Sequence, residues 1–154
     1  MSVIVEPNAF EEEEQLQIPT SGSAIQCWVI SGYASFAWTP VNNVGGPTPD
    51  KLTGDPGDDT QWVSYTVHMV VGPKWLAVRD VSPIVTVAGY TFDNSDEADD
   101  SGYQVDTCTW DTVGLLEGQT EFERVRLKVE LRMRGGSGFG ITKLAYHLVA
   151  NGRM

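Results

Sequence analysis

A chain of 154 residues, of which 41% are hydrophobic, suits one domain with its own core. No apolar run approaches the ~20 residues of a membrane-spanning helix and residues 1–14 lack the features of a secretory signal, so we expect a soluble protein made in the cytoplasm, with no membrane partner. The net charge of −11 argues against nucleic acid as a partner, because an acidic surface repels phosphates over a Debye length of about 8 Å.

The first predicted element is an extended acidic arm over residues 1–23. It combines the apolar triplet Val3–Val5, prolines at positions 7 and 19, and the four glutamates Glu11–Glu14. This composition is typical of a solvated tail, but it also suits an arm that docks on a neighbouring subunit through its triplet and its glutamates. Both alternatives stay open at this point.

Residues 24–150 are predicted to form one all-β domain, followed by a short tail over 151–154. β-Branched and aromatic runs, several of them strictly alternating, predict strands over residues 24–31, 33–39, 61–71, 74–79, 84–92, 103–110, 124–134 and 141–150, with a bend at Gly32. Long loops are expected over 41–59 and 93–102, and a shorter loop over 112–118. Strands of this number and spacing predict a two-sheet antiparallel sandwich, jelly-roll-like, with a closed β-barrel as the alternative.

The most regular predicted strand spans residues 124–134 and has one apolar and one charged face. Residues 124–154 carry seven bases against one acid, whereas residues 1–123 carry three bases against twenty acids. We expect a hairpin with residues 141–150 through the glycine-rich turn 135–140, and this neighbour offers the charged face Lys143 or His147 but no acid. The predicted partners are the arm glutamates, from the same or an adjacent chain, because the planar fork of arginine can hold a carboxylate bidentately. The predicted interface consists of Glu11, Glu12, Glu13, Glu14, Arg124, Arg126, Lys128, Arg132 and Arg134.

No pattern of residues predicts a catalytic site. His68 and His147 are expected on strand faces, and Cys27 and Cys108 as buried thiols, with a disulfide bridge as the alternative. No spacing matches a zinc site, and no cofactor is predicted. A weak calcium alternative rests on the acidic loop, through Asp93, Asp96, Asp99 and Asp100.

These observations predict a non-enzymatic structural protein. A small sandwich with an acidic arm is similar in build to self-associating subunits such as virion decoration or cement proteins and tail accessory proteins. We expect its partners to be other copies of itself, in a homo-oligomer such as a trimer, and a larger protein assembly. The alternative is a lectin-like carbohydrate-binding module that stacks sugars on Trp38, Trp62, Trp75 and Trp110.

Overall fold

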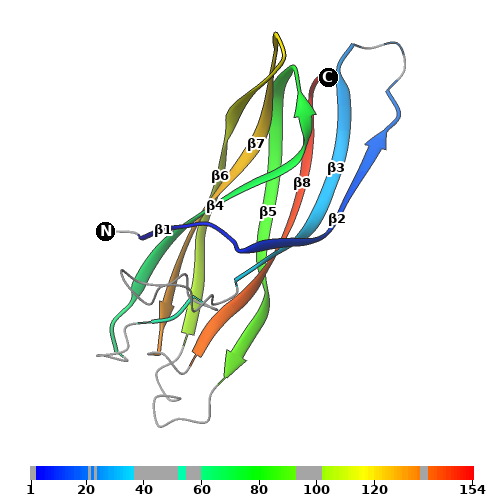
Figure 1. Ribbon diagram of the computed structural model, residues 1–154. Helices are drawn as coiled ribbons and strands as arrows, with labels where there is room; N and C mark the ends of the chain where they lie inside the picture. Colours follow the sequence, from blue (N-terminus) through cyan, green and yellow to red (C-terminus); the bar gives the residue numbers. More distant parts are fainter. Residues whose placement is uncertain are drawn as a thin grey trace.

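Two four-stranded sheets pack face to face as a sandwich (Figure 1). The computed structural model describes residues 3–20, 22, 24–36, 52–54, 60–92, 102–135 and 139–154. Its strands are β1 (Val3–Val5), β2 (Ala9–Ile18), β3 (Gln26–Ser35), β4 (Val63–Trp75), β5 (Ala77–Phe92), β6 (Gly102–Glu117), β7 (Thr120–Arg134) and β8 (Phe139–Arg153). The predicted all-β sandwich is confirmed, and the described strands do not close into a barrel. Within the described ranges, no helix is long and apolar enough to cross a membrane.

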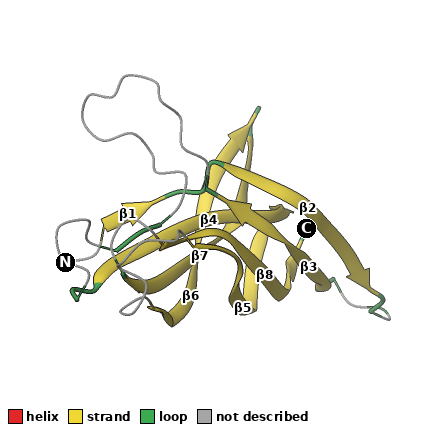
Figure 2. Cartoon of the chain, turned by 90° about the horizontal axis from the view of Figure 1, so that it is seen from below, coloured by secondary structure: helices red, strands yellow, loops and turns green. Residues whose placement is uncertain are grey.

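The chain passes repeatedly from one sheet to the other. Sheet A has the order β1-β4-β7-β6, and sheet B has the order β2-β3-β8-β5. All the strand pairs are antiparallel except β1 with β4. The predicted arm supplies β1 and β2, so that the N-terminal segment gives one edge strand to each sheet. In Figure 2, β2 accordingly lies at the outer edge of its sheet.

The hairpin predicted between residues 124–134 and 141–150 is wrong. β7 pairs with β4 and β6 in sheet A, whereas β8 pairs with β3 and β5 in sheet B. The hairpin partner of β7 is β6, because residues 112–117, predicted as a loop, continue that strand. The two strands join through Gly118 and Gln119, and Gly118 has the positive φ of 61° that a two-residue type II′ turn requires at its first position.

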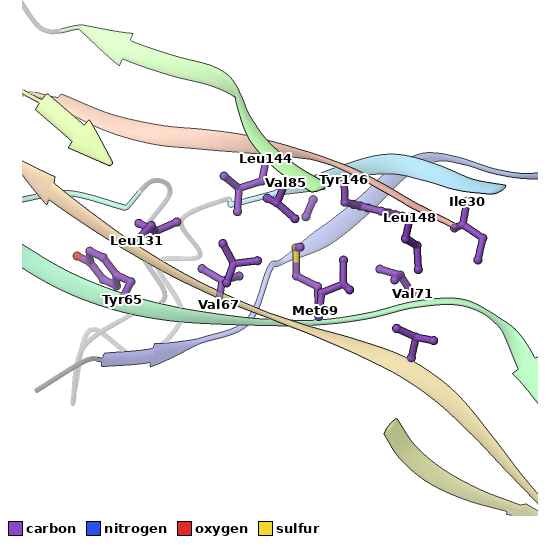
Figure 3. Packing of buried hydrophobic residues seen from close by; sticks show 14 of the residues in the cluster. Ile30, Tyr65, Val67, Met69, Val71, Val85, Leu131, Leu144, Tyr146 and Leu148 are labelled. Atoms are coloured by element: carbon purple, nitrogen blue, oxygen red, sulfur yellow. The ribbon is translucent and has the colours of Figure 1, made fainter. Parts of the chain in front are cut away.

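The core lies between the two sheets and is built from alternate residues of their long central strands (Figure 3). Strand alternation points one set of side chains inward and the other outward. The buried set is Tyr65, Val67, Met69 and Val71 of β4, Val125, Leu127, Val129, Leu131 and Met133 of β7, and Leu144, Tyr146, Leu148 and Ala150 of β8. Burying each large apolar side chain contributes about 1.5–3 kcal/mol, so this pattern defines which face of each strand points inward.

Several strands are longer than the sequence predicts. The runs on either side of Gly32 form the single strand β3, and those on either side of residues 80–83 form the single strand β5, which contains Pro83. Proline is tolerated there because β5 is an edge strand. β8 continues through Arg153, past the predicted end at Ala150. His68 and His147 lie on strands β4 and β8, as predicted.

Candidate interaction site

Strand β6 neutralises most of the charged face of β7. Asp111 accepts two hydrogen bonds from Arg126, at 2.8 Å from Nε and 2.6 Å from Nη2, and lies 3.8 Å from the Lys128 ammonium. Arg132 donates to Asp106 at 3.0 Å from Nε. These acids reach the cations because β6 and β7 are direct neighbours, with Asp111 opposite Arg126. The acids that pair with the β7 cations thus come from β6, the other strand of the same hairpin.

The electrostatics of Asp111 reflect this pairing. The hydrogen bond from Arg126 lowers the pKa of Asp111 below its ordinary value, and the positive charges of Arg126, Lys128 and His68 lower it further. The same hydrogen bond raises the pKa of Arg126. The pair is partly exposed, so solvent screens the attraction and the pair contributes little to stability, as is typical of surface ion pairs.

The predicted sugar-stacking tryptophans do not share one surface. Trp75 is completely buried in the core, so it cannot stack on a ligand, and Trp110 is half-buried against the same core. Trp62 is exposed, but the guanidinium groups of Arg132 and Arg134 lie 5.3 Å and 5.9 Å from its ring centre. Trp38 lies outside the described residues.

A bulge in β2 turns one arm glutamate towards the core. Glu11 pairs with Tyr33 and Glu14 with Ser31, so that two glutamates stand opposite Gly32 alone, and Glu12 adopts a φ of 54°. The Glu13 carboxylate accepts hydrogen bonds from the Tyr146 hydroxyl at 2.8 Å and from the backbone N–H of Gly72 at 3.0 Å. Burial, together with this hydrogen bond, raises the pKa of Tyr146.

The absence of a side chain at Gly32 makes this contact possible. Gly32 pairs with Tyr146 across β3 and β8, and a Cβ at Gly32 would lie 2.5 Å from the Tyr146 hydroxyl oxygen and 3.0 Å from the Glu13 Cα. The tyrosine ring therefore occupies the space that any other residue at Gly32 would fill. A glycine opposite an aromatic residue on the neighbouring strand is a recurrent means of fixing register.

The arm glutamates and the β7 cations come together at one point only among the described residues. Arg124 donates from Nε to the carbonyl of Gly72 at 3.0 Å, and the N–H of the same glycine binds Glu13. Glu11 instead forms a 2.8 Å ion pair with Lys143 of β8, which raises the pKa of Lys143. The carboxylates of Glu12 and Glu14 form no hydrogen bond or ion pair with the described residues. An intermolecular contact of the arm with β7 stays a prediction.

The outer face of sheet B carries a band of apolar side chains. Register places Leu16, Val29 and Val149 side by side on neighbouring strands, and their inward neighbours Ile30, Leu148 and Ala150 are buried. A row here is a line of directly opposite, outward-facing residues that runs across the strands. Ile84 of β5 lies in the next row on one side of Leu16, Val29 and Val149, and Ile18 of β2 lies in the next row on the other side. Leu16 is 68% exposed and Ile84 63% exposed. We call the set Leu16, Ile18, Val29, Ile84 and Val149 the outer band.

The surface of the described residues includes two shallow hollows. One, of about 620 Å³, lies beside the outer band and is lined by Glu12, Glu13, Glu14, Ser31, Gly32, Tyr33 and His147. The other, of about 470 Å³, lies near the turn of the β6–β7 hairpin and includes Leu76, Leu116 and Phe122. Leu116 is 66% exposed, so the second hollow also presents apolar surface.

In the part of the chain that the structure describes, no three His, Cys, Asp or Glu side chains gather in a group that could hold a metal ion. The calcium candidates Asp93, Asp96, Asp99 and Asp100 lie outside the described residues. Cys27 and Cys108 are free and half-buried, and burial raises the pKa of the Cys108 thiol. The alternative of a disulfide bridge between them is therefore wrong: Cys27 lies on the outward face of sheet B, opposite Ile18, whereas Cys108 packs against the core from sheet A.

Comparisons of this chain with protein-family models, curated proteins and solved structures find no match. The site is thus defined by its geometry. Sequence reasoning missed the pairing of Asp106 and Asp111 with β7, the contact of Glu13 with Tyr146, and the outer band. The first could have been found from Gly118 and Gln119, a two-residue hairpin signal between alternating runs. The others depend on the order of the strands in sheet B, for which the sequence has no local signal.

Proposed function

We propose that this chain is a non-enzymatic structural subunit that self-associates within a larger protein assembly, as virion decoration or cement proteins and tail accessory proteins do. The observation that carries the proposal is the gathering of exposed apolar side chains on the N-terminal edge strands. Val3, Ile4, Phe10, Leu16 and Ile18 all belong to β1 or β2 and are exposed. Exposed apolar groups on edge strands invite pairing or packing with another chain, so a subunit contact gives them a role.

The acidic character of the same segment supports a specific contact. β2 carries four glutamates within ten residues, and charge at an edge strand discourages random edge-to-edge pairing. A surface that combines apolar groups with such charges suits a partner of defined shape and charge.

Solution mass tests this proposal directly. Sedimentation velocity of the full chain at physiological salt, at concentrations up to about 100 µM, covers association down to weak micromolar affinity. We expect a closed oligomer of uniform mass. A monomer over the whole range would contradict the proposal, and binding on a glycan array would favour the lectin-like alternative.

A further inference from the structure

We propose that the outer band of sheet B packs against the same band of a second copy of this chain, about a two-fold axis. The inference rests on the proposed self-association and names its surface. The two outer faces of the sandwich differ in a way that favours this one. On sheet A, Arg126 and Arg132 already have acidic partners on β6, and docking there would desolvate ion pairs. The outer band lets two copies bury apolar surface with little such cost.

The charges at the two ends of the band make it self-complementary. Glu14 lies in the row of Ser31 and His147, one row from Val149 on one side. Arg153 follows Val149 and Asn151 along the outward face of β8, and thus lies two rows away on the other side. Neither the Glu14 carboxylate nor the Arg153 guanidinium forms a hydrogen bond or ion pair with the described residues.

A two-fold axis makes use of both ends at once. If the axis passes between Val29 and Cys27 of β3 and runs obliquely across the strands, at right angles to the line from Glu14 on β2 to Arg153 on β8, it exchanges the two ends of the band. The apolar rows of the two copies then cross over each other, and Glu14 of each copy faces Arg153 of the other. A foreign partner that is purely basic or purely acidic matches only one end of the band. A second copy matches both, because a two-fold contact uses the same surface twice.

The test compares substitutions in the band with a matched substitution elsewhere. Sedimentation velocity is run on the wild-type chain, on Leu16→Glu and on Leu116→Glu, which adds the same charge at an equally exposed leucine in the hairpin hollow. We expect Leu16→Glu to weaken the dimer by about a hundredfold, because one charge from each copy enters the apolar contact, and Leu116→Glu to leave it unchanged. Circular dichroism melting confirms that both variants remain folded.

A charge exchange then tests the proposed pairing. Glu14→Arg and Arg153→Glu are each expected to weaken the dimer by about tenfold, because each places like charges together, and the double variant is expected to recover most of the affinity. Four results would each overturn the inference. They are a dimer that Leu16→Glu leaves unaffected, a dimer that Leu116→Glu abolishes, a trimeric mass, and a double variant that associates more weakly than either single variant. In each of these cases the chain still self-associates and the proposed function stands, whereas a wild-type monomer contradicts both.

Discussion

At the scale of single residues, Gly32 and Tyr146 determine how the N-terminal strand is held. Gly32 leaves room for the tyrosine ring, and the hydroxyl reaches the Glu13 carboxylate in the β2 bulge. Glu13 also accepts a hydrogen bond from the backbone N–H of Gly72, which belongs to β4 of sheet A. This one carboxylate therefore joins the edge of sheet B to sheet A. The bulge, with Glu12 in a left-handed conformation, is the backbone feature that turns this carboxylate inward.

Gly32→Ala is expected to lower the free energy of unfolding by about 1–3 kcal/mol, because the new methyl group overlaps Tyr146 and the β2 backbone. Gly114→Ala is the matched control. Gly114 also lies in a strand, but a Cβ there meets no atom within 4 Å, so this variant is expected to be neutral or up to about 1 kcal/mol more stable. Urea unfolding measures both, and equal effects of the two substitutions would contradict the account of Gly32.

At the scale of secondary-structure elements, the β6–β7 hairpin balances its own charge. Asp106 and Asp111 of β6 lie beside Arg132 and Arg126 of β7. The strongly basic strand therefore needs no external anion for these two arginines. β2 behaves differently, since only Glu11 and Glu13 of its four glutamates bind side chains or backbone within the described chain.

The ion pair of Asp111 predicts a pH dependence. Its pKa is lower in the folded chain than the ordinary value of 3.8, so its stabilisation is complete above that value and is lost as pH falls through the lower, folded-state pKa. Because the pair is half-exposed, we expect Asp111→Asn to lose less than about 1 kcal/mol at neutral pH and to show a shallower loss of stability in acid than the wild type.

Urea midpoints measured from about pH 7 to pH 2 test this pH dependence. Glu121→Gln, at an exposed carboxylate of the same hairpin that forms no ion pair with the described residues, is the control. It is expected to follow the wild-type curve. An Asp111→Asn curve that runs parallel to the wild type through the acidic range would show that the ion pair contributes nothing.

At the scale of the whole molecule, non-covalent packing between the two sheets holds the sandwich together. Each sheet contains one of the two cysteines, and both thiols are free. We therefore expect the same melting temperature with and without a reducing agent. A fall in melting temperature on reduction would reveal a disulfide bridge and contradict the structure, and mass spectrometry of the alkylated protein, with two modified cysteines expected, provides a second readout.

A structural feature could be predicted from the sequence where it depends on consecutive residues, and could not where it depends on residues far apart in the chain. The inward face of β7 was predicted because alternation is a property of consecutive residues, and Val125, Leu127 and Val129 are buried as expected. The neighbours of β7 were not predicted, because pairing depends on residues far apart in sequence. The proposed hairpin with residues 141–150 placed Lys143 beside the β7 cations, whereas it binds Glu11 in the other sheet.

The sequence by itself determined that this protein is built from β-strands with one buried face, because strict alternation of apolar residues is typical of such strands, whereas the structure decided for the sandwich over the closed barrel. It also showed that the N-terminal segment is acidic and that residues 124–134 are basic. Only the tertiary structure decided that β6 neutralises most of that basic strand, that β2 forms an edge of the other sheet, and that Leu16, Val29 and Val149 align on an exposed face. The reason is physical: side-chain direction is set locally along a strand, whereas the order of strands is set by packing of the whole chain.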